Sequence, residues 1–285
     1  MFYFSGTRNT EVVSQLFKKE LSKNNSDIEI LRIEDILKEN TKLDMTKYDL
    51  IGIGHPVLGF ETPRIIYHFI NLIPIVKNKK TFLFKIASDS STINNGASRR
   101  AIRKLKNKGY NVFHESLICM PSNWILKYCD EFSKQLCNVA KTKIKVFCGE
   151  IIDNKKRYLR VNFFLWIILV SIGILEDFGS RFFGKDLFIN DSCKLCKKCI
   201  NNCPTDNIIF INNKIKFSWN CIWCMRCIYD CPNKAISPHF LKFCVVKGGY
   251  SIHSIMNNRR LKGQFITKNT RGYFKHFYDY IRNQN

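Results

Sequence analysis

Short apolar runs alternate with amphipathic stretches over the first 150 residues. The runs that predict strands are FYFS, IEILRI, YDLIGIG, TFLFKIA and YNVFHESLI, and helical patterns fall at about residues 10–23, 62–73 and 97–108. Nearly all-apolar strands separated by helices indicate a parallel sheet that is covered on both faces. The predicted fold class of this half is therefore α/β with a doubly wound sheet, in which ligands bind at the carboxyl ends of the strands.

The longest apolar run, VNFFLWIILVSIGIL at residues 161–175, contains no charged residue. Crossing a bilayer takes about 20 apolar residues, so this run of 15 is expected to be too short to span a membrane. A helix attached to the membrane interface and a packed connector between domains remain as alternatives, and the connector is favoured.

After this run the chain repeats itself. CKLCKKCINNCPTDNI at residues 193–208 is followed, at an offset of 28 residues, by CIWCMRCIYDCPNKAI at 221–236. Such a period indicates two copies of one small unit. Between the copies, IIFINNKIKF predicts a β-hairpin that turns at Asn212 and Asn213, because asparagine tolerates a positive φ.

Both copies carry the spacing C-x2-C-x2-C-x3-C-P. Three thiolates on one tight loop reach three irons of a cubane cluster, and the fourth cysteine, before proline, ligates the other cluster. The expected ligands are Cys193, Cys196, Cys199 and Cys231 for cluster one, and Cys221, Cys224, Cys227 and Cys203 for cluster two. Structural zinc is disfavoured, because it prefers paired C-x2-C knuckles at longer separations.

These motifs resemble the bacterial-type ferredoxin with two 4Fe-4S clusters, a small α+β domain. The resemblance implies one-electron transfer at low potential, without substrate chemistry at the clusters. The other five cysteines have no such spacing and are expected to be small core residues. They are Cys119, Cys129, Cys137, Cys148 and Cys244.

The stretch FSGTRNT, residues 4–10, joins the first strand to the first helix. Amides and hydroxyls at the positive end of a helix can surround a phosphate. The stretch resembles the phosphate loop of flavodoxins, which implies that Ser5, Thr7, Asn9 and Thr10 hold the phosphate of FMN. Arg8 replaces a small residue of those loops; its charge either pairs with the phosphate or lies on a loop that has lost its ligand.

Two later stretches extend this resemblance. GHPVLGFETP and ASDSSTINNGA follow the third and fourth strands, where flavodoxins place loops beside the flavin. The implied additional FMN contacts are Pro56, Val57, Leu58, Gly59 and Ser88. No catalytic residue is predicted, because His55 and Glu61 are equally explained as solvated loop residues.

Together with PSNWI near residue 121, this arrangement resembles a family of clostridial-type fusion ferredoxins. The resemblance implies a flavodoxin-like FMN-binding domain at 1–150, a linker with the apolar helix at 151–186, a two-cluster ferredoxin domain at 187–242 and a basic aromatic tail at 243–285. The implied function is electron transfer between FMN and two 4Fe-4S clusters in an anaerobic redox chain, with redox proteins as partners. The alternative is a clusters-only carrier whose first domain has lost FMN and serves as a docking module. Whether the protein is an enzyme stays open.

Composition adds three expectations to this interpretation. Among 285 residues, 46 Lys and Arg against 23 Asp and Glu give a net charge of +23. The basic residues are scattered and no recognition module accompanies them, so no nucleic-acid partner is expected, whereas peripheral membrane contact stays possible. Thirteen cysteines without a secretory signal favour a reducing compartment, which predicts a cytoplasmic location.

Overall fold

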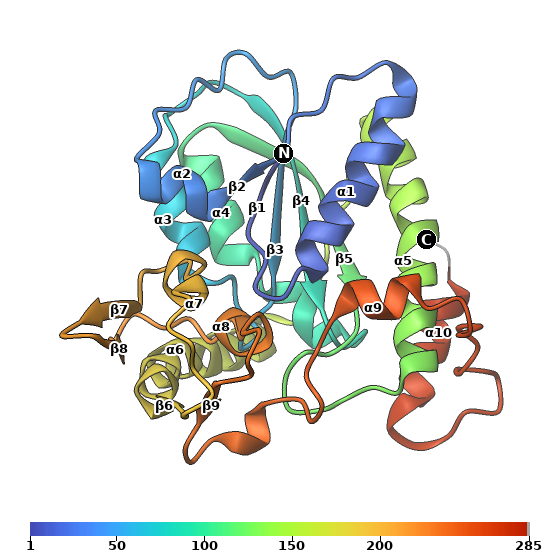
Figure 1. Ribbon diagram of the computed structural model, residues 1–285. Helices are drawn as coiled ribbons and strands as arrows, with labels where there is room; N and C mark the ends of the chain where they lie inside the picture. Colours follow the sequence, from blue (N-terminus) through green and yellow to red (C-terminus); the bar gives the residue numbers. More distant parts are fainter. Residues whose placement is uncertain (284–285) are drawn as a thin grey trace.

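A five-stranded parallel sheet organises the N-terminal half of the molecule. A computed structural model describes residues 1–283, and its strands follow the order β2-β1-β3-β4-β5 (Figure 1). The strands are β1 (Phe2–Tyr3), β2 (Leu31–Arg32), β3 (Ile51–Pro56), β4 (Lys79–Ala87) and β5 (Tyr110–Cys119). This is the flavodoxin-like strand order, with its switch point between β1 and β3, so the predicted fold class is confirmed.

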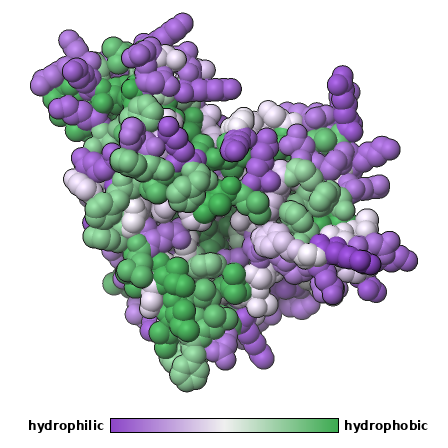
Figure 2. Space-filling view, turned by 90° about the horizontal axis from the view of Figure 1, so that it is seen from below, coloured by the Kyte–Doolittle hydropathy of each residue, from purple (hydrophilic) through white to green (hydrophobic). Residues whose placement is uncertain are grey.

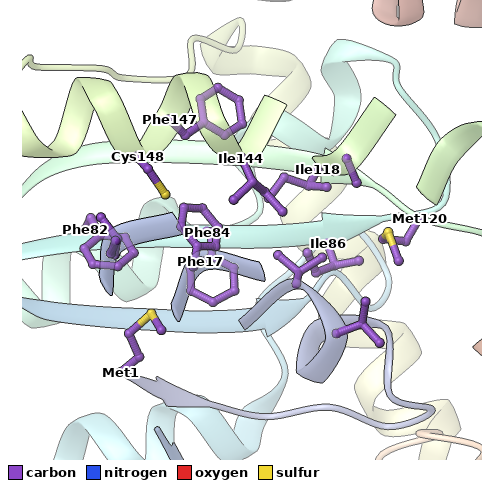
Figure 3. Packing of buried hydrophobic residues seen from close by; sticks show 14 of the residues in the cluster. Met1, Phe17, Phe82, Phe84, Ile86, Ile118, Met120, Ile144, Phe147 and Cys148 are labelled. Carbon is purple, nitrogen blue, oxygen red and sulfur yellow. The ribbon is translucent and has the colours of Figure 1, made fainter. Parts of the chain in front are cut away.

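Helices cover both faces of this sheet. On one face lie α1 (Asn9–Leu21) and α5 (Asp130–Ile152), and on the other lie α2 (Ile33–Glu39), α3 (Arg64–Leu72) and α4 (Arg99–Asn107). Figure 3 shows the first layer, in which the rings of Phe17 and Phe84 lie 4.7 Å apart beneath Phe147 of α5. Short 3-10 turns at Ser22–Asn24 and Thr92–Gly96 complete this half.

The edge of the sheet is shorter than the apolar pattern predicts. Phe2 pairs with Leu31 and Tyr3 with Arg32, and the regular pairing between β1 and β2 stops there. The expected strand IEILRI therefore contributes only Leu31 and Arg32, because β2 has a single neighbouring strand and that strand is itself two residues long.

The repeat region forms a small α+β unit below the carboxyl ends of the strands (Figure 1). β6 (Leu187–Ile189) pairs antiparallel with β9 (Ile236–Pro238), and the short helices α7 (Lys198–Asn201) and α8 (Arg226–Tyr229) follow the two cysteine loops. β7 (Ile208–Ile211) and β8 (Lys214–Phe217) form the predicted hairpin. Asn212 and Asn213 have φ of 51° and 58°, which confirms the turn.

Helix α6 (Phe163–Asp186) connects the two halves and is longer than the charge-free run. Asn162 caps its N-terminus, since the Asn162 side chain accepts hydrogen bonds from the amides of Phe164 and Leu165, and the helix continues past Glu176 and Asp177 to 24 residues. Among the described residues it is the one helix that is long and apolar enough to cross a membrane by length and composition. The expectation that this segment is too short was wrong, because Phe178, Phe182 and Phe183 extend its apolar character.

The C-terminal segment runs back over the α/β half. It contains a 3-10 turn at Lys242–Cys244, α9 (Ile252–Asn257), a second 3-10 turn at Gly272–His276 and α10 (Phe277–Arg282). Ile252 joins the core around α1 and α5, and the ring of Phe277 lies 4.8 Å from that of Phe132 in α5. The basic aromatic tail is therefore docked on its own chain.

Candidate functional site

The eight motif cysteines gather around two small cavities. One is lined by Cys193, Cys196, Cys199 and Cys231, and the other by Cys203, Cys221, Cys224 and Cys227. These are the two crossed sets expected from the spacing. Within residues 1–283 no group of three or more His, Cys, Asp or Glu side chains is arranged to hold a single metal ion. Each set of four thiols lines a separate small space, and four thiolates around one space are the ligand set of a cubane cluster.

The backbone of the two cysteine loops repeats as closely as the sequence does. Leu195 and Lys197 have positive φ in the first loop, and Trp223 and Met225 have it at the equivalent positions of the second. Alternation of right- and left-handed residues turns successive amides toward one point and favours a bound anion. Three amides already donate to ligand sulfurs: Asn207 to Cys203 Sγ at 3.2 Å, Trp223 to Cys221 Sγ at 3.4 Å and Ala235 to Cys231 Sγ at 3.2 Å.

The two thiol sites differ in their exposure to solvent. Burial raises the pKa of Cys221 to about 12 and that of Cys224 to about 11, so thiolates there need a compensating cation such as cluster iron. In cluster one, Cys196 is exposed beside Lys194 and Lys197. Cluster one is thus the outer site and cluster two the inner one.

A larger cavity of about 440 Å³ lies between the sheet and the second cysteine loop. We call it the interdomain cavity; its volume is within the range of small-molecule sites. Nine of the ten residues expected to contact FMN line it: Ser5, Thr7, Asn9, Thr10, Pro56, Val57, Leu58, Gly59 and Ser88. The loops after β1, β3 and β4 therefore converge, as the switch point of this fold requires.

The turn at residues 5–10 carries donors without protein partners. The amides of Gly6 to Thr10 donate to no backbone carbonyl in the described chain, and the buried Ser5 Oγ has no partner there. Arg226 holds the opposite side of the turn by donating to the carbonyls of Ser5 and Gly6. Because a trans peptide points its N–H away from its C=O, the amides of Gly6 and Thr7 face away from Arg226. This donor set fits an anion such as a phosphate.

Two of the expected phosphate contacts are engaged elsewhere. The guanidinium of Arg8 does not line the cavity and forms an ion pair with Asp230, in which both Nη1–Oδ1 and Nη2–Oδ2 measure 2.8 Å. The Asn9 amide donates to Pro121 O at 3.0 Å, and its oxygen accepts from Tyr250 Oη. The expectation that Arg8 contacts the phosphate is therefore corrected: Arg8 pairs with Asp230, the residue before Cys231. The Asn9 side chain lies at the rim of the interdomain cavity.

The turn also touches a cluster ligand directly. A Cβ atom on Gly6 would lie 2.4 Å from Cys224 O, so only glycine permits this approach. Cys224 itself lines both the cluster two cavity and the interdomain cavity. The turn at residues 5–10 and the cluster two site are therefore packed against each other.

The sequence did not single out several residues that close the interdomain cavity. They are Asn123, Trp124, Glu176, Trp223 and Tyr273. The indoles of Trp124 and Trp223 meet edge to face at 5.1 Å, and neither Nε1 has a partner among the described residues. Asn123 and Trp124 had a signal, the PSNWI stretch. Glu176, Trp223 and Tyr273 come from α6, the second cysteine loop and the tail, whose positions no local pattern reveals.

Three residue expectations need correction. His55 is fully buried, and burial lowers its pKa to about 4, so it is a neutral core residue. Glu61 is also buried, and it accepts from Tyr67 Oη at 2.7 Å; neither residue is solvated. Among the five non-motif cysteines, Cys129 is exposed, whereas the other four are core residues as predicted.

Comparison with known proteins finds a family match for the cysteine region. Residues 185–232, which contain all eight motif cysteines, match the model of the 4Fe-4S dicluster domain. The fold and the thiol sites therefore define an electron-transfer protein with a flavodoxin-like domain and two 4Fe-4S clusters. A search of curated proteins finds no match.

Two solved structures align with the α/β half. A chain from Bacteroides uniformis ATCC 8492, described as a putative flavoprotein, is 21% identical with a TM-score of 0.33, over 42% of this chain and 89% of its own. A flavodoxin from the domain Archaea is 14% identical with a TM-score of 0.33, over 53% of this chain and 99% of its own. At these scores the fold assignment rests on the strand order.

Proposed function

We propose that the protein transfers electrons between FMN, held in the interdomain cavity, and the two 4Fe-4S clusters. The position of Cys224 carries this proposal, because this cluster ligand forms a shared wall between the cluster two cavity and the interdomain cavity. FMN supplies the conversion between two-electron and one-electron steps. The protein places the flavin site, the cluster two site and the cluster one site in a row along which electrons would pass.

The residues present suit the parts of FMN. The unpartnered amides of Gly6 to Thr10, with the hydroxyls of Ser5 and Thr10, would hold the phosphate without a cationic side chain. Trp124 and Trp223 give the cavity an aromatic wall with two free N–H donors for polar atoms of the ring system. At the other end, the exposed Cys196 and its neighbouring lysines favour a redox partner with an acidic surface.

Titration of anaerobically purified protein with FMN tests this function. We expect about eight irons per chain, as two cubane clusters require, and binding of one FMN. Thr10→Val should weaken FMN binding by about tenfold, since a hydroxyl at the helix N-terminus is lost. Ser14→Ala is the matched control, because that hydroxyl lies one turn further along α1 and donates to Thr10 O at 2.8 Å.

Full iron content without any FMN binding would overturn the flavin part of the proposal. The protein would then be a clusters-only carrier, and its flavodoxin-like half would serve as a docking module.

A further inference from the structure

Helix α6 leaves one complete face uncovered. At about 100° per residue, the following side chains project within an arc of roughly 80°: Phe164, Ile168, Ser171, Leu175, Phe178 and Phe182. Phe164 and Leu175 are 74% and 70% exposed, and the stripe from Phe164 to Phe182 is about 27 Å long at 1.5 Å per residue. Figure 2, seen from the end of the molecule where α6 lies, shows a contiguous hydrophobic patch.

The opposite face of α6 is fixed to the protein along its length. Leu169, Gly173, Ser180 and Gly184 are buried on that face. Ser180 Oγ donates to Cys221 O at 2.8 Å, and Asp177 pairs with Arg64 of α3 at 2.9 Å. A helix held in this way cannot cross a bilayer without leaving its own domain, so its exposed stripe can only lie along a surface.

Neighbouring elements enlarge the stripe with aromatic residues. Trp219 is 52% exposed, and its ring lies 5.4 Å from that of Phe182. Phe240 is 81% exposed, and its amide donates to Asp186 at the end of α6. Exposed aromatic side chains beside an apolar helix are typical of the interface between lipid headgroups and acyl chains.

Basic residues surround this apolar face. Arg99 lies 6.0 Å from the ring of the exposed Phe163 in the first turn, and Lys185 lies 5.1 Å from that of Trp219 at the other end. Arg160, Arg181 and Lys242 are exposed close to the helix in sequence or beside Phe240. This rim complements an anionic lipid surface. Two copies of the chain meeting through the same patch would bring their like-charged rims together, which disfavours a dimer.

We propose that α6, Trp219 and Phe240 form a membrane-docking face that binds an anionic bilayer surface, with α6 lying in the plane of the interface. The apolar stripe would enter the boundary between headgroups and acyl chains while the basic rim contacts the headgroups. Because α6 also backs the loop of Cys221, cluster two would lie on the membrane side of the molecule. The proposal does not depend on FMN.

Vesicle flotation of the anaerobic full chain tests this proposal. The wild type should float with vesicles of phosphatidylcholine and phosphatidylglycerol, and less with phosphatidylcholine alone or at high salt. Phe164→Gln with Leu175→Gln should lower partitioning by on the order of ten- to a hundredfold. The control Ile75→Gln with Ile152→Gln changes two exposed apolar side chains far from α6 and should bind as the wild type does.

Three results would overturn the proposal. The first is equal flotation of the wild type and the α6 variant. The second is a stable dimer that only the α6 variant dissociates, since the occupant would then be a second copy. The third is wild type that resists alkaline extraction from membranes, which would make α6 an integral span. The visible spectrum of the clusters should be unchanged in both variants, which shows that each has folded.

Discussion

Single residues tie the flavodoxin-like half to the cluster half. Arg226, between two cluster ligands, contacts Glu34 at 2.6 Å and donates to the carbonyl side of the turn at residues 5–10. Arg8, in this turn, forms a second link between the two halves through its ion pair with Asp230. Its φ of 71° lies in the left-handed region, which for a residue other than glycine costs roughly 1 to 2 kcal/mol. The sequence shows the unusual Arg8 but not its partner, which lies 222 residues away.

Substitutions at Arg8 separate backbone strain from the ion pair. Arg8→Ala keeps the strained φ and loses a partly exposed pair, so it should lower stability by about 1 kcal/mol. Arg8→Gly loses the same pair but relieves the strain, so its stability should stay near that of the wild type. Thermal midpoints of the cluster-loaded protein should therefore differ by about 2 to 4 °C. Equal midpoints for the two variants would show that the left-handed geometry carries no strain.

Gly6 is the closest point between the turn and cluster two. Gly6→Ala would place a methyl group 2.4 Å from Cys224 O, and relief of that overlap should cost about 1 to 3 kcal/mol. We expect weaker FMN binding by about tenfold and an altered electron paramagnetic resonance signal of reduced cluster two. Gly149→Ala is the control, because a Cβ at that helical position meets nothing within 4 Å. Unchanged behaviour of Gly6→Ala would refute the close contact.

Glu176 gives the stability of the protein a defined pH dependence. Burial raises its pKa from 4.5 to about 7, so the folded state binds more protons than the unfolded state between these values. The free energy of unfolding therefore falls as pH rises through this window. Glu176→Gln should be more stable than the wild type above pH 8, by on the order of 2 kcal/mol, and should lose this advantage near pH 5. Thermal midpoints at the two pH values measure the difference; a constant difference would contradict the assignment.

At the scale of elements, sequence patterns correctly predicted the hairpin and the cysteine loops, whose structures depend on residues close together in the chain. The hairpin at residues 208–217 could be predicted from two asparagines that accept positive φ, and the cysteine loops could be predicted from the spacing of their cysteines. Sequence patterns failed for elements whose length or position depends on distant parts of the chain. β2 is short because its neighbour β1 is short, and α5 was not predicted at all. The length of α6 was missed because Glu176 and Asp177 interrupt its apolar run while facing the protein.

The crossed ligand sets also make a prediction at this scale. Cys203→Ala should selectively damage cluster two, although Cys203 belongs to the first repeat, because it lines the same cavity as Cys221, Cys224 and Cys227. Cys231→Ala should damage cluster one, because Cys231 lines the same cavity as the other three cluster one cysteines. Iron content and electron paramagnetic resonance of the reduced protein distinguish these cases. Loss of cluster one in Cys203→Ala would reverse the assignment.

At the scale of the whole molecule, three cavities follow one another from the sheet outward. The interdomain cavity meets cluster two at Cys224, the short helices after the two cysteine loops bring the cluster sites together, and cluster one opens to solvent at Cys196. The proposed membrane-docking face lies beside cluster two, which would leave the basic surface of cluster one free for a redox partner. Sequence predicted the components of this path but not their order, which depends on contacts between the two halves.

Flash photoreduction of FMN bound to the anaerobic protein tests the central claim most directly. Flavin reoxidation and cluster reduction, followed at their separate absorption bands, should proceed together at a rate that does not change with protein concentration, because both cofactors belong to one chain. A rate that rises in proportion to protein concentration, or clusters that stay oxidised while the flavin is reduced, would contradict the proposed electron path.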